Sequence, residues 1–339
     1  MSSSVLCFGE LLLRLGAPSQ QLLLQTPSLD VHVGGAEANV GVALACLGHD
    51  VAMAGVVADN ALGSAALGEL RRHGVDTRHV RRSAGRMGLY FMTAGAGLRP
   101  GEVVYDRAES AFAAAPADSY EWPTLLRGAQ WLHLSGISPA LGPQAAQATL
   151  AAARAACDMG IKVSFDGNFR PRLWERWGGD AQAILRDLFA CAHIVFADHR
   201  DIGVVLGGEF SQGDAQARVD AAAAMAFAAF PQLQYMACTQ RTTHNASRHA
   251  LGAMLLGRDG TRALASVREL DGIVDRIGGG DAFAAGVLHG LMEGFDSATT
   301  IRFGLAAGCL KHSIPGDFCP VGVADVMALM DEETFDVRR

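Results

Sequence analysis

The residues best suited to chemistry lie in one short run, in which Gly278, Gly279 and Gly280 are followed by Asp281. The apolar residues after them have the spacing of one helix face: Ala284, Val287, Leu288 and Leu291. Bare amides at a helix N-terminus stabilise an oligophosphate or a developing negative charge. An acid there would repel an anion, but it can take a proton from a hydroxyl that attacks a phosphate. The run therefore predicts phosphoryl transfer, with Asp281 as the base.

Other phosphate and metal chemistries lack their sequence patterns. The two lysines, Lys162 and Lys311, do not follow a glycine, so the chain has no P-loop. The dinucleotide-binding pattern G-x-G-x-x-G/A fails at Phe283, which argues against a dehydrogenase. No H-E-x-x-H sequence and no clustered Cys/His spacing indicates zinc.

Composition places the chain among folded, soluble proteins with a sizeable core. Of its 339 residues, 50% are hydrophobic and 19% are charged, and the net charge is −7. An acidic chain without a basic block argues against nucleic acid and anionic membranes as partners. The seven cysteines are scattered, which predicts free thiols in a reducing compartment and therefore a cytoplasmic protein.

The elements that must position the glycine run alternate between strand and helix. In the first part of the chain we expect strands at 5–8 and 51–57, helices at 36–47 and 62–73, and a β-ribbon at 87–105. From residue 129 we expect strands at 131–134, 162–165, 194–196 and 235–239, with helices at 144–157, 179–191 and 215–229. This alternation predicts a mostly parallel sheet covered on both faces, with ligands at the carboxyl ends of its strands.

Two distant segments together point to a known family. Residues 34–48, which begin Gly34-Gly35-Ala36-Glu37-Ala38-Asn39, resemble the N-terminal signature of the ribokinase-like (PfkB) carbohydrate kinases, and residues 275–286 resemble their C-terminal signature. The resemblance implies a three-layer α/β/α core from residues 1–9, 34–85 and 113–339. It also implies a small β lid over the sugar, built from residues 10–33 and 86–112. In that family the glycines form an anion hole and the aspartate, here Asp281, is the base.

A subgroup of the family offers a substrate. Arg276 stands where most members have a small residue, and in this it is similar to the 2-keto-3-deoxygluconate (KDG) kinases. Residues 105–108, 166–174 and 310–318 also look like segments of that subgroup. A sugar acid needs a fixed cation, and a guanidinium binds a carboxylate in a bidentate way. The candidate sugar-binding residues are Gly34, Gly35, Asn39, Tyr90, Tyr105, Arg107 and Arg170.

The remaining candidates serve the nucleotide and its metal. With the glycines we group four candidate nucleotide-binding residues: Asp198, Thr239, Arg241 and Lys311. Asp198 and Asp201 take the place of an N-x-x-E segment tied to magnesium in many members, and carboxylates still suit Mg²⁺, usually through water. The expected cofactors are ATP and Mg²⁺, with activation by K⁺ left open. A homodimer or higher oligomer formed through the lid is also left open.

The predicted reaction is phosphorylation of KDG by ATP at its terminal primary hydroxyl, which gives 2-keto-3-deoxy-6-phosphogluconate. One alternative is a sibling kinase acting on a neutral ketose, pentose or nucleoside. Another is a catalytically silent protein that binds a sugar acid. Single residues also keep alternatives: Asp281 as a mere helix cap, Arg107 in an ion pair with Asp106 or Glu109, and Arg172 or Arg176 in place of Arg170.

Overall fold

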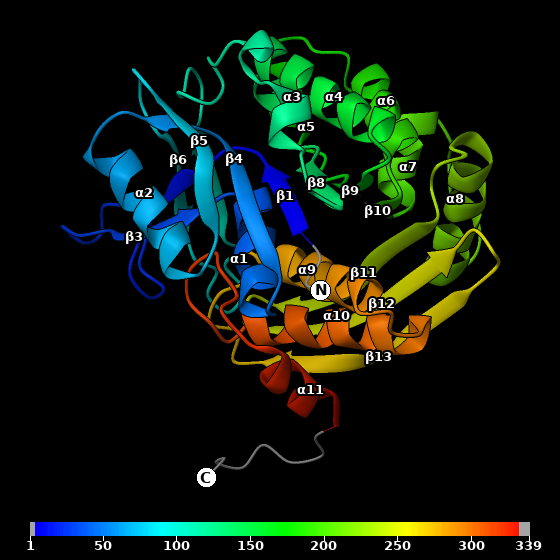
Figure 1. Cartoon of the computed structure of the whole chain (residues 1–339). Coiled ribbons are helices and arrows are strands. Elements are labelled where there is room, and N and C mark those ends of the chain that lie inside the picture. The colour runs from blue at the N-terminus through cyan, green and yellow to red at the C-terminus, as the bar shows by residue number, and fades with distance from the viewer. Residues whose placement is uncertain (1–3, 332–339) are drawn as a thin grey trace.

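The strands of the computed structural model, which describes residues 4–331, form two sheets (Figure 1). The outer ends of the predicted core, 1–3 and 332–339, lie outside the described residues. Within residues 4–331 the large sheet has nine strands. Their order across the sheet is β13 (Arg262–Asp271), β12 (Arg248–Gly257), β11 (Tyr235–Asn245), β10 (Ile194–Phe196), β9 (Lys162–Asp166), β8 (Trp131–Ser135), β1 (Ser4–Phe8), β4 (Asp50–Ala58) and β5 (Asp76–Ser83).

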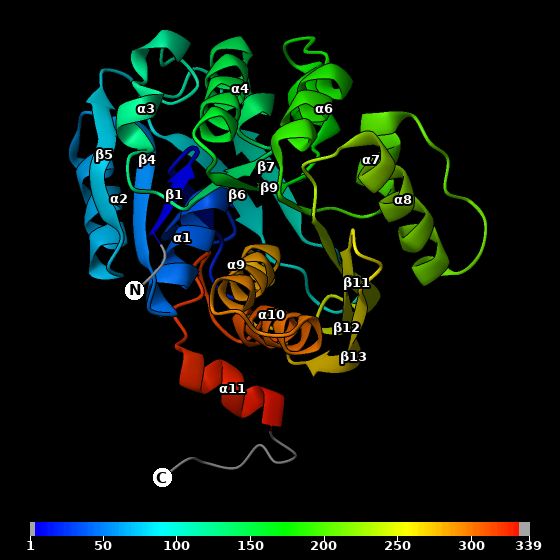
Figure 2. The same cartoon turned by 45° about the vertical axis from the view of Figure 1, so that its right-hand side comes forward.

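The large sheet is parallel from β5 to β11 and antiparallel only in the pairs β11–β12 and β12–β13. Helices cover both of its faces (Figures 1 and 2). On one face α4 (Pro143–Asp158) and α6 (Ala181–Cys191) pack on β9, and on the other α1 (Ala36–Cys46) packs on β1, β4 and β8. The predicted mostly parallel α/β/α architecture is confirmed.

The other helices complete these layers. Figure 2 shows α9 and α10 on the side of the sheet opposite α4 and α6. Their bounds are α2 (Ala61–Arg72), α3 (Trp122–Leu125), α5 (Pro171–Glu175), α7 (His199–Leu206), α8 (Ala215–Ala229), α9 (Gly279–Met292), α10 (Ser297–Lys311) and α11 (Val323–Asp331). No helix within residues 4–331 is both long enough and apolar enough to span a membrane.

The second sheet has the strand order β3 (Asp30–Gly34), β2 (Leu12–Gly16), β6 (Gly88–Thr93) and β7 (Glu102–Asp106). These strands come from the two segments in which the resemblance predicts a lid. The segment 10–33 supplies β2 and all of β3 except its last residue, Gly34. The pairing of β2 with β6 is parallel and joins the two segments into one unit.

The sequence reasoning missed the antiparallel edge of the large sheet. The predicted strand 235–239 continues to Asn245, and β12 and β13 follow it as hairpin partners. The residues of β11 beyond Thr239 are polar and mostly exposed, so the apolar pattern stops there. The strand continues because its backbone groups pair with β12, a contact that hydrophobic periodicity does not report.

Candidate active site

A cavity of about 800 Å³ lies between the second sheet and the large sheet, and the first turns of α1 and α9 reach it. It brings together most of the predicted site residues: Gly35, Asn39, Tyr90, Tyr105, Arg107, Arg170, Asp201, Thr239, Arg241, Gly278, Gly280 and Asp281. Four predicted residues do not line it: Gly34, Gly279, Asp198 and Lys311.

Asp281 is held by a residue from the other end of the chain. The amide Nδ2 of Asn39 donates a hydrogen bond of 2.6 Å to Asp281 Oδ2. Gly278 is the N-cap residue of α9, and no side chain among the described residues caps that helix, so Asp281 is not a mere helix cap. Burial raises the pKa of Asp281 to about 6, against the effect of the Asn39 hydrogen bond. The carboxylate is therefore oriented, and its pKa lies closer to neutral pH than that of an ordinary aspartate.

The glycines before Asp281 have different surroundings. Gly278 has φ of 79°, and a Cβ on it would lie 2.0 Å from the carbonyl oxygen of Asp317, so only glycine fits there. Gly280 is exposed and lines the cavity. Gly279 is buried, and a Cβ on it would lie 2.8 Å from the His312 ring. The predicted three-glycine lining is therefore wrong at Gly279, whose role is to let the helix pack closely.

Two arginines of the cavity have no carboxylate partner among the described residues. Arg241 and Arg276 both line the cavity, and neither forms an ion pair within residues 4–331. Unpaired guanidinium groups beside free amides favour a multiply charged anion. Arg276 was not among the predicted site residues, although its departure from the small residue of the family pattern was the signal that could have placed it there.

The two predicted carboxylate-binding arginines differ in their exposure to solvent and in the partners of their guanidinium groups. Arg107 is 3% exposed, and its Nε donates to Glu10 Oε2 at 2.6 Å. The suggested pairing of Arg107 with Asp106 or Glu109 is wrong, because Asp106 pairs with Arg86 and the Arg107 partner is buried Glu10.

Arg170 is exposed, and its guanidinium donates to the carbonyl oxygen of Phe169. Of the three neighbouring arginines considered at this place, Arg170 lines the cavity and Arg172 and Arg176 do not.

A buried ionic network links the second sheet to the loop before α9. Arg14 Nη2 lies 2.6 Å from Asp275 Oδ2, and Arg14 Nε lies 3.2 Å from Asp317 Oδ1. The Tyr90 hydroxyl donates a hydrogen bond of 2.7 Å to Asp317 Oδ2. The Tyr90 hydroxyl is therefore already engaged as a donor, although Tyr90 lines the cavity as a predicted sugar-binding residue should. The network fixes β2 and β6 relative to the loop before α9.

Gly34 and Lys311 contact residues around the cavity but do not line it. A Cβ on Gly34 would lie 2.2 Å from Asp317 Oδ2, so this glycine makes room for the carboxylate and does not line the cavity. Lys311 is fully buried, and its Nζ donates to the carbonyl oxygens of Ile314 at 2.7 Å and Asp275 at 3.4 Å. The predicted nucleotide contact of Lys311 is corrected, because its ammonium points into the protein beneath Gly278.

The geometry favours Asp166 over the predicted Asp198 as the partner of Asp201 at a metal site. Asp198 caps α7 and pairs with Arg200 at 2.6 Å, so its oxygens are already used. Asp201 lines the cavity together with Asp166. Burial raises the pKa of Asp201 to about 6 and that of Asp166 to about 8, and repulsion from Asp281 and Asp201 contributes at Asp166. A divalent cation would relieve this repulsion, so Asp166 and Asp201 fit Mg²⁺ better than Asp198 does.

Comparison with known proteins agrees with this geometry. Residues 2–317 match the pfkB family carbohydrate kinase model. A 2-dehydro-3-deoxygalactonokinase of Haloferax volcanii is 31% identical over 95% of this chain and 94% of that protein. A 2-dehydro-3-deoxygluconokinase of Bacillus subtilis is 27% identical over 94% of this chain and 92% of that protein.

A solved structure shares the fold over almost its whole length. The crystal structure of a 2-dehydro-3-deoxygluconokinase from Thermotoga maritima has a TM-score of 0.90 and 36% identity, and the match covers 97% of this chain and 100% of that one. The matched length, the shared fold and the two signature segments lead to one conclusion: the chain belongs to the pfkB family of carbohydrate kinases.

Proposed function

We propose that this kinase transfers the terminal phosphoryl group of ATP to the primary hydroxyl of 2-keto-3-deoxygluconate, which gives 2-keto-3-deoxy-6-phosphogluconate. The observation that carries the proposal is the Asp281 carboxylate, oriented by Asn39 at 2.6 Å in a cavity whose other charged residues include unpaired arginines. The relatives named for this reaction or for its galactose-derived counterpart support the substrate class.

Asp281 is the proposed general base. Its Oδ2 accepts a hydrogen bond from Asn39, which leaves Oδ1 for the sugar hydroxyl. A carboxylate with a pKa of about 6 is a better base than an ordinary aspartate with a pKa near 3.9. It accepts the hydroxyl proton as the new oxygen–phosphorus bond forms, and the bond from phosphorus to the leaving oxygen breaks.

The anion side of the cavity supplies the charge that this step requires. The backbone N–H groups at the start of α9 and the guanidinium groups of Arg241 and Arg276 would bear the negative charge of the transferring group. Thr239 would contribute a hydroxyl on the same side. Mg²⁺, when bound at Asp166 and Asp201, would neutralise part of the phosphate charge.

The residues on the sugar side of the cavity would bind the carboxylate of the sugar acid. Arg170 faces the cavity, and Arg107 contributes the part of its guanidinium that Glu10 does not use. Tyr105 and the Gly35 backbone line the same region. The proposed lid, residues 10–33 and 86–112, would exclude water, which otherwise competes with the sugar hydroxyl. Leu24, Leu98 and Val104 are exposed in these segments, and a second copy of the chain covering them is the oligomer we propose.

Removing the Arg170 guanidinium should separate acidic from neutral substrates. We expect Arg170→Met to raise the KM for KDG by about tenfold to a hundredfold, because a charged hydrogen bond contributes roughly 1.5–3 kcal/mol. Activity on fructose or ribose should not change. The measurement is a coupled ATPase assay on KDG, its C4 epimer, gluconate, fructose and ribose. Arg172→Met is the matched control, since Arg172 is exposed and does not line the cavity.

The same panel tests the function. The highest kcat/KM on KDG would support the proposal, whereas a preference for the C4 epimer would favour the second candidate function that the Haloferax volcanii relative suggests. A preference for fructose or ribose would contradict both candidate functions and would support the alternative of a kinase that acts on a neutral sugar. Binding of KDG without turnover of ATP would indicate the silent binding protein.

The pH dependence should follow the raised pKa of Asp281. Only the ionised carboxylate can accept a proton, so kcat/KM should rise about tenfold per pH unit below pH 6 and level off above it. The measurement is the kcat/KM profile from pH 4 to pH 8 with excess coupling enzymes. A profile already flat above pH 5 would mean that the reacting base has an ordinary aspartate pKa, and would contradict the raised pKa of Asp281.

A further inference from the structure

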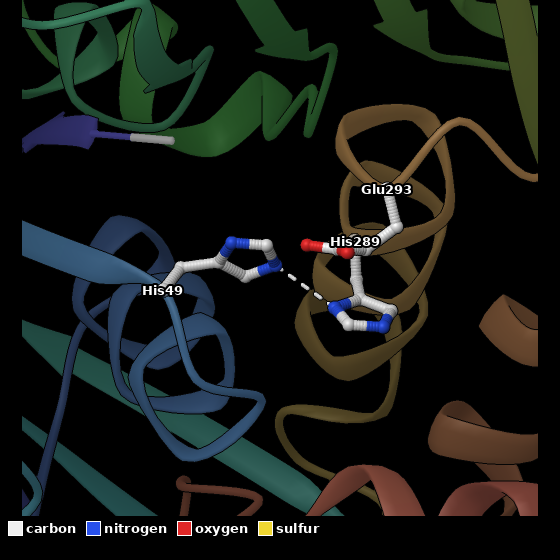
Figure 3. Close-up of side chains that lie close together, drawn as sticks. All are labelled: His49, His289 and Glu293. Atoms are coloured by element: carbon white, nitrogen blue, oxygen red, sulfur yellow. Dashed lines mark hydrogen bonds between the residues drawn. The ribbon is translucent and has the colours of Figure 1, made fainter. Parts of the chain in front are cut away.

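Three potential metal ligands meet far from the sugar cavity, at the C-terminal ends of α1 and α9 (Figure 3). His49 follows α1, His289 lies in the last turn of α9, and Glu293 is the residue at which α9 ends. One ligand atom from each lies within 4.8 Å of the other two. His49 Nε2 and His289 Nδ1 face each other at 2.8 Å.

Aromatic packing holds the His289 ring in position. His289 stacks on Phe303, with ring centroids 4.7 Å apart and planes at 23°, and Phe295 packs edge-on against it. His49 and His289 are 6% and 4% exposed, whereas Glu293 is exposed and gives access from solvent. His289 and Glu293 are four residues apart in sequence, so they share one face of the helix end.

The two facing nitrogens share one proton, because His49 Nε2 and His289 Nδ1 form a hydrogen bond in which one ring donates and the other accepts. Burial lowers the pKa of His49, and it lowers the pKa of His289 to about 4 with a further contribution from His49. The carboxylates of Glu293 and Asp50 oppose the shift at His49, and Glu293 opposes it at His289. One of the two rings must therefore move its proton to its other nitrogen before both facing nitrogens can bind a metal.

From this arrangement we propose a second metal site, in which His49 Nε2, His289 Nδ1 and the Glu293 carboxylate bind Zn²⁺ or a similar divalent transition metal. Two imidazoles and one carboxylate suit such ions, while Mg²⁺ prefers oxygen ligands. Tetrahedral Zn–N bonds of about 2.0–2.1 Å place two ligand nitrogens about 3.3 Å apart. The observed 2.8 Å needs only a small opening of the pair, and a water molecule would complete the coordination.

A metal bound at this site would hold together α1 and α9, the helices that carry Asn39 and Asp281. Asn39 and Asp281 join the N-terminal parts of α1 and α9, and His49 and His289 join their other ends. Asp281 and His289 are eight residues apart, which is about 12 Å along a helix. The bound metal would therefore stabilise the helix pair without touching the substrate, a role separate from the proposed Mg²⁺ at Asp166 and Asp201.

Titration with Co²⁺ tests this site directly. The full chain, treated with a chelator and dialysed into excess Mg²⁺ to saturate oxygen-ligand sites, should bind one Co²⁺ per chain. The visible bands should be those of tetrahedral nitrogen and oxygen coordination, and Zn²⁺ should displace the Co²⁺. The thermal unfolding midpoint should rise with Zn²⁺, because a ligand that binds only the folded state stabilises it.

Exposed Glu293 provides the variant that should still fold. We expect Glu293→Gln to weaken Co²⁺ binding at least about tenfold, because it removes a charged ligand. Glu69→Gln is the matched control, since Glu69 also lies four residues from a histidine, His73 at 3.4 Å, but belongs to no group of three ligands among the described residues. Its Co²⁺ affinity should equal that of the wild type.

Three results would overturn the proposal. The first is no Co²⁺ uptake by the wild type, which would leave His49 and His289 as a hydrogen-bonded pair only. The second is unchanged affinity in Glu293→Gln. The third is a thiolate-to-cobalt absorption band, which would assign the metal to cysteines.

Discussion

An Asp281→Asn variant should lose turnover by about a hundredfold to ten-thousandfold, the usual contribution of a general base. The amide cannot accept the sugar hydroxyl proton, yet it fills the same volume beside Asn39. KM values for ATP and the sugar acid should change little, because the hydrogen bonds that hold the ground state are mostly retained. The measurement is kcat in the coupled assay, with the fold checked by circular dichroism.

Asp296→Asn is the matched control for that result. Asp296 is the N-cap residue of α10 and accepts a hydrogen bond from the Thr299 amide, so its replacement alters a helix start without touching the cavity. It should keep wild-type turnover. Retention of more than a tenth of wild-type turnover by a folded Asp281→Asn variant would remove Asp281 from the role of base.

The largest effect on stability should come from Arg14→Met. The guanidinium is buried between Asp275 and Asp317, and these two carboxylates raise its pKa despite the opposing effect of burial. Removing the cation leaves two carboxylates close together in the interior without their ion-pair partner. Breaking a buried ion pair in this way costs about 3–5 kcal/mol in the free energy of unfolding. Urea denaturation measures the change.

Two variants with smaller expected losses in unfolding free energy serve as comparisons for Arg14→Met. Tyr90→Phe removes one hydrogen bond to Asp317 and leaves the ion pairs, so it should destabilise the protein less. Arg154→Met breaks the exposed pair with Asp187, which should change the unfolding free energy little. A loss in Arg14→Met no larger than in Arg154→Met would mean that the network is screened by solvent and does not hold the second sheet in place.

The sequence could predict the parts of the site that depend on local pattern. The glycine run, Asp281 and the helix after them have the residue types and spacing that an anion-binding helix start requires, and α9 begins at Gly279. The parallel strands were likewise visible as short apolar runs between helices. The family resemblance added Asn39 and Arg170, both of which line the cavity.

The rest depends on contacts between distant residues. The bond between Asn39 and Asp281 joins positions 242 residues apart, and nothing local to either one reports it. Lys311 looked like a phosphate-binding cation, but its direction depends on how α10 packs beneath Gly278. The meeting of His49 and His289 is equally invisible to a search for sequence spacing, because 240 residues separate them.

The contact between Gly34 and Asp317 limits how this chain can evolve. Any side chain at position 34 would collide with the carboxylate, since a Cβ there lies 2.2 Å from Asp317 Oδ2. A shorter residue at position 317 would make room, but it would also leave Arg14 and Tyr90 without a shared partner. Each single change is therefore harmful in the background of the other native residue. The two positions are therefore epistatic: a side chain at position 34 requires a shorter residue at position 317, and that pair of changes in turn requires a new partner for Arg14 and Tyr90.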